Sequence, residues 1–234
     1  MAVSSSPQLE RSGPDKAARR FRSLVIILAA SLASFAVWIL VAEFLRMPPA
    51  EFPIDPDSAR VKTDHNSAHV AARVGVIRGD LWAEDALTYS DVFRRDGVQN
   101  SDTIESARVI AERALVFGPH DARVWLILAS VDSRFDWLNG KASTALRLSY
   151  YTGANEVRLI PVRLSLALGL PAISDPDFQQ LVTHDLRIIV LRHPELKPAI
   201  VSAYRYALPA GQQFVQAALK ELDPNLISKL EKRE

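Results

Sequence analysis

The 234-residue chain contains no cysteine, so it can form neither a disulfide framework nor a metal site with thiolate ligands. The chain also has almost no net charge, because its 28 lysine and arginine residues are balanced by 27 acidic ones. Nucleic-acid binding needs a concentrated basic face, and no long basic block occurs. We therefore expect no nucleic-acid partner.

Recognisable catalytic motifs are absent as well. The chain has no glycine-rich phosphate loop and no serine in a G-x-S-x-G elbow. His65 and His69 are spaced i, i+4, but Asn66 stands where the zinc-protease motif H-E-x-x-H has its glutamate. We interpret both as surface histidines, and expect no metal, no cofactor and no enzyme activity.

A long apolar run, residues 23–44, has no charged residue before Glu43. As a helix it would reach about 33 Å, enough to cross a bilayer core of roughly 30 Å. A cleaved signal peptide is the main alternative, with small residues at Ser31 and Ala33 as a cleavage site. Because the hydrophobicity continues for about ten residues beyond them, the run favours an uncleaved transmembrane helix in contact with lipid.

The flanking charges predict the orientation of this helix. Residues 1–22 carry five basic and two acidic side chains, which predicts a cytoplasmic tail and an exported C-terminal part. The serine and proline residues among positions 1–15 predict that this tail is disordered. The expected location is a bacterial inner membrane, with residues 61–234 in the periplasm after a proline-rich linker, residues 45–60. Small residues within the run would let two such helices pack as a homodimer: Ala29, Ala30, Ala33 and Ser34.

Residues 61–234 read as an all-α domain, because apolar residues recur at three- and four-residue spacing. Asp175 before Pro176 predicts a helix cap with proline in the first turn, and Pro161 should kink its helix or delay its start. The expected helices are 65–77, 81–93, 103–117, 122–133, 141–151, 156–168, 176–191, 194–207 and 210–222, with a short one after Pro224.

Part of this domain repeats. Ala107 and Ala114 recur thirty-five residues later as Ala142 and Ser149. Trp82 and Ala86 recur forty-three residues later as Trp125 and Ala129. The two offsets agree if residues 94–101 hold an insertion of about eight residues, and a two-helix unit of about 34 residues is the tetratricopeptide period.

On these residues the chain resembles the tetratricopeptide repeat family over residues 80–156. Trp125, Leu128 and Ala129 match its first helix, and Ala107, Ala114 and Pro119 match its second. Asp132 departs from the pattern where the family has tyrosine, and Ala111 where it has a large aromatic residue. The resemblance implies a solenoid of helical hairpins with a concave groove lined by the first helices. The groove positions it implies are Asp80, Leu87, Asp91, Arg123, Ser130, Arg134, Glu156 and Arg163.

The sequence therefore predicts a membrane-anchored, non-enzymatic scaffold that holds envelope proteins or a polymer near the membrane. By analogy, such proteins accompany polysaccharide synthesis and export. One alternative is an accessory or weak glycan-acting enzyme that uses Asp132 and Asp136, which flank a turn with aromatic residues. A secreted soluble binder and a purely structural dimer are the other two.

Overall fold

The structure is a computed structural model that describes residues 14–46, 65–89, 101–135 and 140–231. Most of the expected linker, residues 45–60, lies outside these ranges. The chain divides into two units, residues 1–44 and 45–234, and each is described by itself.

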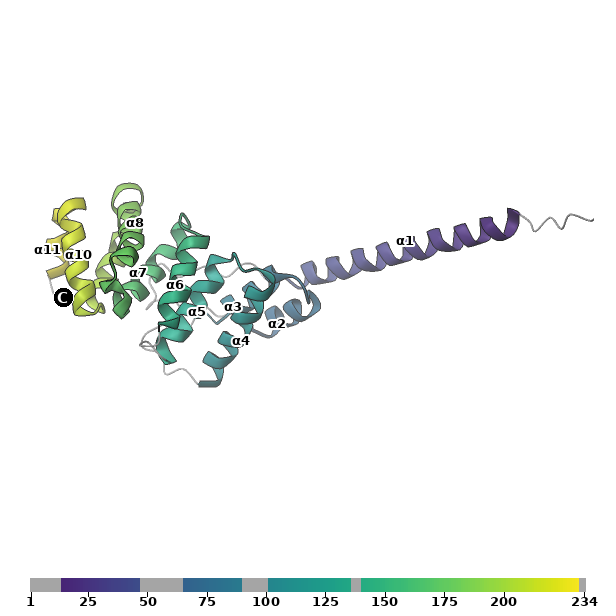
Figure 1. The fold of residues 1–234 in the computed structure, drawn as a ribbon, viewed down its shortest axis with the longest axis horizontal. Coiled ribbons are helices and arrows are strands. Elements are labelled where there is room, and N and C mark those ends of the chain that lie inside the picture. Colours follow the sequence, from purple (N-terminus) through teal and green to yellow (C-terminus); the bar gives the residue numbers. More distant parts are fainter. Residues whose placement is uncertain (1–13, 47–64, 90–100, 136–139, 232–234) are drawn as a thin grey trace, which may run out of the picture. The chain divides into compact units, whose positions relative to one another are not determined.

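The first unit contains one helix, α1 (Pro14–Phe44), coloured purple in Figure 1. Its stretch from Ala18 to Phe44 is long and apolar enough to span a membrane. Large apolar side chains such as Leu24, Ile27 and Leu40 are exposed along it, as expected of a helix that is apolar on every face. Residues 14–22, expected in a disordered tail, belong to this helix.

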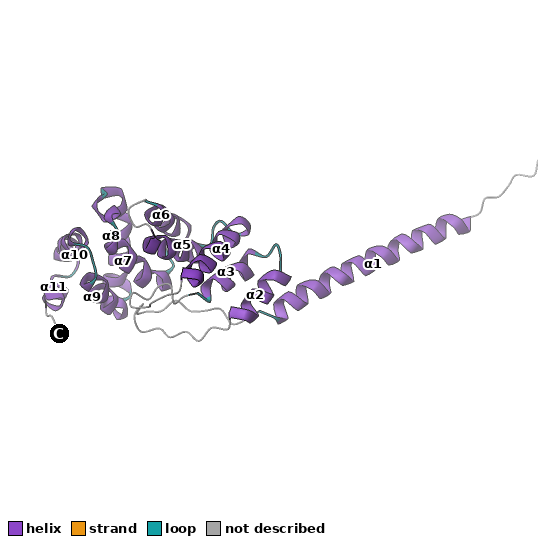
Figure 2. Cartoon of the chain, turned by 90° about the horizontal axis from the view of Figure 1, so that it is seen from below, coloured by secondary structure: helices purple, strands orange, loops and turns teal. Residues whose placement is uncertain are grey.

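The second unit is helical throughout its described residues, and no strand occurs among them. Its helices are α2 (His65–Val74), α3 (Gly79–Leu87), α4 (Ser101–Phe117), α5 (Ala122–Phe135), α6 (Lys141–Thr152), α7 (Ile160–Gly169), α8 (Pro176–Arg192), α9 (Lys197–Arg205), α10 (Pro209–Leu222) and α11 (Pro224–Glu231). Among the described residues, three 3-10 turns join them: η2 (Val157–Leu159), η3 (Pro171–Ser174) and η4 (Pro194–Leu196). The all-α prediction is therefore confirmed, as Figure 2 shows.

The predicted helix ends agree with the structure at its most specific signals. Asp175 caps α8, and its carboxylate accepts a hydrogen bond from the backbone N–H of Asp177 at 3.0 Å. Pro161 lies in the first turn of α7, and the segment before it forms the turn η2, so this helix starts late rather than kinking. The predicted helix 81–93 is observed as α3, and its last residues lie outside the described ranges.

Helices α3 to α6 form two successive hairpins, visible side by side in Figure 1. Helix α3 packs against α4 and α5 against α6, while α4 and α3 also contact α5. At one end of each hairpin, a glycine lies so close to the partner helix that a side chain would not fit. A Cβ at Gly79 would lie 2.9 Å from the Phe117 carbonyl carbon, and a Cβ at Gly153 would lie 2.5 Å from the Ala122 Cβ.

Equivalent side chains in the two hairpins make equivalent bonds. The Trp82 indole N–H donates to the Val76 carbonyl at 3.1 Å, and the Trp125 indole donates to the Pro119 carbonyl at 2.8 Å. In both cases the acceptor stands six residues before the tryptophan. The recurrence found in the sequence is therefore a repeat of structure.

An ion pair at the start of each first helix repeats with its charges exchanged. The Arg78 guanidinium donates to both oxygens of Asp80, at 3.1 and 2.6 Å. Forty-three residues later, Arg123 donates to both oxygens of Asp121, at 3.0 and 2.6 Å. The acid and the base have changed places, and the bidentate geometry remains.

The regular order changes after α6. Helix α7 contacts α5 but packs mainly against α9, and α10 contacts α7, α8 and α11. The first helices still follow one another, since α3 contacts α5, α5 contacts α7 and α7 contacts α9. Fully buried side chains fill the interior, among them Leu126, Ile127, Leu146, Leu164, Leu168 and Phe178. The domain is thus compatible with a helical repeat.

Candidate functional site

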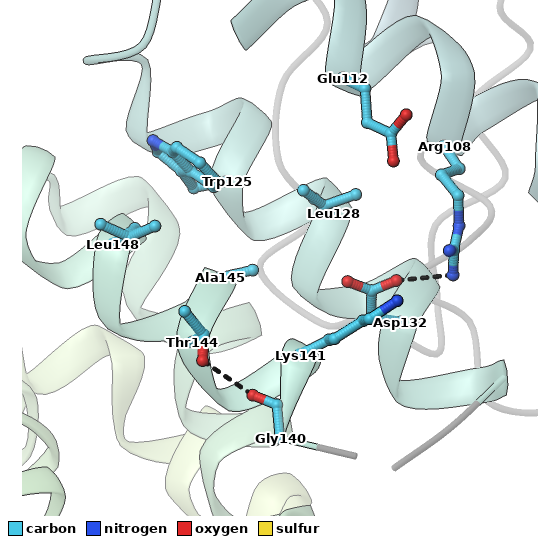
Figure 3. Close-up of a pocket in the computed structure, with 10 residues that line it drawn as sticks. All are labelled: Arg108, Glu112, Trp125, Leu128, Asp132, Gly140, Lys141, Thr144, Ala145 and Leu148. Atoms are coloured by element: carbon cyan, nitrogen blue, oxygen red, sulfur yellow. Dashed lines mark hydrogen bonds and ion pairs between the residues drawn. The ribbon is translucent and has the colours of Figure 1, made fainter.

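A pocket of about 450 Å³ opens between helices α4, α5 and α6. Figure 3 shows the side chains that surround it, which come from all three helices and from the residue before α6. They are Arg108, Glu112, Trp125, Leu128, Asp132, Gly140, Lys141, Thr144, Ala145 and Leu148. The pocket therefore lies on the side of the second helices of the two hairpins, α4 and α6, with the first helix α5 between them.

One end of the pocket is apolar. Trp125, Leu128 and Leu148 are each only partly buried, although all three are large apolar residues. The small side chain of Ala145 lies between them on α6, where the equivalent residue of the preceding hairpin is Ile110. Because the side chain of Ala145 is smaller than that of Ile110, it leaves more space between the helices at this position. This end would hold an apolar side chain of a ligand.

The other end is charged. Arg108 on α4 donates to Asp132 on α5 at 2.6 Å, and its guanidinium carbon lies 5.2 Å from the centre of the Phe135 ring. Burial raises the pKa of Asp132, while the positive charges of Arg108 and Lys141 oppose this rise. A second pocket of about 330 Å³ shares these three residues and adds Glu105 and Phe135.

This charged end has an unused donor. The Nε atom of Arg108 is buried and makes no hydrogen bond within the described part of the chain, and the Glu105 carboxylate is 4.0 Å from it. A buried donor without an acceptor costs free energy, which an incoming acceptor would recover. Together, the two ends suit a ligand that carries an apolar group beside a hydrogen-bond acceptor.

None of the predicted groove positions lines this pocket. Three of them, Leu87, Ser130 and Arg163, are buried, so they present no surface to a partner in this structure. Sequence spacing placed them on a groove face, but neighbouring helices cover that face.

The other predicted positions have varied surroundings. Asp80 and Arg123 are engaged in the bidentate pairs described above, which lower the pKa of Asp80 and raise that of Arg123. Arg134 is partly buried, which lowers its pKa, and Glu156 is exposed. Asp91 lies outside the described residues, so its predicted role stays a prediction.

The sequence reasoning missed most of the pocket. It singled out Asp132, but not Arg108, Glu112, Lys141 or Leu148. A signal was present, because Arg108 and Glu112 share one face of α4 at i, i+4 spacing. The predicted groove positions follow the first helices of the repeat, whereas the pocket also needs side chains of the second helices, α4 and α6.

A separate buried cluster joins α6, α7 and α8. The Arg163 guanidinium lies 4.9 Å from the centre of the Tyr150 ring, and Asp185 is buried beside them. Burial raises the pKa of Asp185 to about 7, against the opposing effects of Arg163 and Tyr150. The cluster has no exposed surface, so its effect is on stability.

Metal ligation by three or more side chains is not observed, since the described residues hold no group of three histidines or acids arranged for it. Asp136, the second acid of the enzyme hypothesis, lies outside the described residues. Comparison with family models, curated proteins and solved structures gave no match.

Proposed function

We propose that this protein is a single-pass membrane-anchored scaffold that binds a segment of a partner protein between α4, α5 and α6. The observation that carries the proposal is the 450 Å³ pocket, with its apolar end at Trp125, Leu128 and Leu148 and its charged end at Arg108 and Lys141. In this proposal the domain is a tetratricopeptide-like solenoid that binds through its second helices.

The charges favour a protein over a charged polymer. Two basic side chains, Arg108 and Lys141, face two acidic ones, Glu112 and Asp132, so the pocket has no excess charge for a polyanion. A peptide segment offers an apolar side chain and a carbonyl or carboxylate within a few ångströms, which matches the two ends. The proposed partners are other envelope proteins, including those of polysaccharide synthesis or export.

The proposed location is a bacterial inner membrane with the domain in the periplasm. Support comes from the apolar run 23–44 within α1 and from the basic residues that precede this run, Arg19, Arg20 and Arg22. A reporter that is active only outside the cytoplasm tests this orientation. It should be active when fused after Glu234 and inactive when fused before Met1. The reverse result would overturn the orientation.

Binding is tested by crosslinking in intact membranes. A photo-reactive residue at Thr144, which is exposed at the pocket, should give a defined adduct. The same residue at Gln180, exposed on α8 and away from the pocket, should not.

Charge variants make this test specific. Lys141→Glu reverses an exposed charge at the pocket and should remove the adduct, while Lys220→Glu on α10 should leave it unchanged. Equal adducts at Thr144 and Gln180, or an adduct insensitive to Lys141→Glu, would reject the pocket as the binding site.

A weak glycan-acting enzyme is the second candidate, favoured by one observation. Asp132 lies in the pocket with its pKa raised by burial, a property that a general acid requires. The double variant Asp132→Asn, Asp136→Asn tests this candidate. Lost turnover of envelope glycan with retained crosslinking would favour the enzyme, and unchanged turnover would reject it.

A further inference from the structure

Two histidines one turn apart on α2 bond to α3 and to the residue that follows it, and α3 packs beside α2. The Nδ1 atom of His69 lies 2.9 Å from Oδ2 of Asp85, and the Nδ1 atom of His65 lies 2.7 Å from the hydroxyl of Thr88. Asp85 is fully buried, whereas the side chain of His69 is 42% exposed. In each imidazole ring, Nδ1 is therefore engaged with a neighbouring side chain, and Nε2 is the nitrogen that remains for a ligand.

The hydrogen bonds of Thr88 determine which nitrogen of His65 carries the proton. The Thr88 hydroxyl lies 2.6 Å from the carbonyl oxygen of Asp85, which can only accept, so the hydroxyl hydrogen is donated there. The hydroxyl must then accept from His65, and Nδ1 of His65 carries the hydrogen. Its Nε2 consequently has a free lone pair when the ring is neutral.

The same reasoning applies to His69. An ionised carboxylate only accepts hydrogen bonds, so Nδ1 of His69 donates to Asp85 and Nε2 keeps its lone pair. A carboxylate behind a histidine is the arrangement that orients metal ligands and increases their basicity.

Aromatic neighbours hold both rings in place. The His65 ring lies 4.6 Å from the Tyr89 ring, tilted by 33°, and the His69 ring meets the Trp82 ring nearly edge-on at 6.4 Å. The two imidazoles are thus oriented by the fold. Histidines at i, i+4 share one helix face, so the two imidazole side chains lie on one side of α2.

We propose that His65 and His69 chelate one divalent transition ion, Zn²⁺, Ni²⁺ or Cu²⁺, through their Nε2 atoms. Imidazole nitrogen suits these ions, whereas Mg²⁺ and Ca²⁺ require oxygen ligands. Asp85 and Thr88 act behind the ligands by fixing their tautomers. Since the described residues supply two ligands, water completes the coordination. This site lies apart from the pocket and is independent of the proposed scaffold function.

Metal titration of the full-length protein in detergent micelles tests the site, with a purification tag that contains no histidine. Zn²⁺ and Ni²⁺ should bind with one-to-one stoichiometry by calorimetry, and Mg²⁺ should not bind. His65→Ala and His69→Ala should each weaken binding by at least about tenfold, and Asp85→Asn by about 10- to 100-fold. The control His193→Ala removes a histidine that pairs with Glu195 elsewhere, and should change nothing.

Asp85→Asn changes a buried group and could unfold the helix pair, so the decisive measurement uses the unmodified chain. Nuclear magnetic resonance of the imidazole nitrogens should show the Nδ1–H tautomer for both rings, and Zn²⁺ should shift Nε2 of His65 and His69 alone. An Nε2–H tautomer, no saturation in the millimolar range, or affinity unchanged in both alanine variants would each overturn the proposal.

Discussion

The guanidinium of Arg163 in α7 donates to the carbonyl of Gly153, the residue after the last turn of α6, at 2.9 Å. It also bonds to Ser149, both to the hydroxyl, at 3.1 Å, and to the carbonyl. The last carbonyls of a helix have no partner within the helix, so Arg163 satisfies groups that α6 leaves open. The side chain has no exposed surface and links the second hairpin to the rest of the domain.

Replacing this arginine should strongly destabilise the domain. Arg163→Met removes the partners of the α6 carbonyls and leaves the buried Asp185 without its compensating charge, at an expected cost of about 3–5 kcal/mol. Urea unfolding followed by circular dichroism measures the change. The matched control, Arg187→Met on the exposed side of α8, should change stability by less than about 0.5 kcal/mol. Equal effects of the two variants would contradict the assigned role.

The stability of the domain should decrease as the pH rises from about 4 to 7. The pKa of Asp185 is about 7 in the folded state and near its ordinary value of 3.8 when unfolded, so the folded state binds its proton more tightly. This contribution is fully present below the unfolded pKa and is lost as the pH rises through the folded one. Asp185→Asn should flatten this part of the curve, measured by urea unfolding at a series of pH values. An unchanged slope would show that another group causes it.

A methyl group should be tolerated at one glycine and rejected at another. A Cβ at Gly153 would lie 2.5 Å from the Ala122 Cβ, so Gly153→Ala forces α5 and α6 apart at an expected cost of about 1–3 kcal/mol. A Cβ at Gly169, at the end of α7, would meet nothing within 4 Å. Gly169→Ala should therefore be neutral or stabilising by about 0.5 kcal/mol. Thermal unfolding of both variants compares their stabilities. A neutral effect of Gly153→Ala would contradict the prediction.

The two equivalent tryptophans should differ in their contribution to stability. Trp82 is 3% exposed, and Arg113 lies over its ring at 4.4 Å. Trp125 is only partly buried and faces the pocket. Trp82→Ala should cost about 3–5 kcal/mol, and Trp125→Ala clearly less, in the same chemical unfolding experiment. If Trp125→Ala costs as much, its ring is part of the core, and the apolar end of the pocket is misassigned.

Local signals in the sequence predicted where several helices begin. Asp175 and Pro176 marked the start of α8, and Pro161 the late start of α7, because capping and proline geometry act within one turn. Three of the predicted groove positions, Leu87, Ser130 and Arg163, are buried in the structure, and the role of the groove stays a prediction. Spacing gives the face of a helix on which a residue lies, but not which neighbour covers that face.

The sequence alone determined the long apolar helix, the all-α domain and the offsets of forty-three and thirty-five residues between its hairpins. These features depend on the spacing of apolar residues and on local chemistry, both of which can be seen in short stretches of sequence. Tertiary structure decided where the pocket lies and how the two histidines are oriented. The pocket lies where side chains of α4, α5 and α6 meet, and the orientation of His65 and His69 depends on Asp85 of α3 and on Thr88, which follows it. Both arise from contacts between helices, which no single stretch of sequence contains.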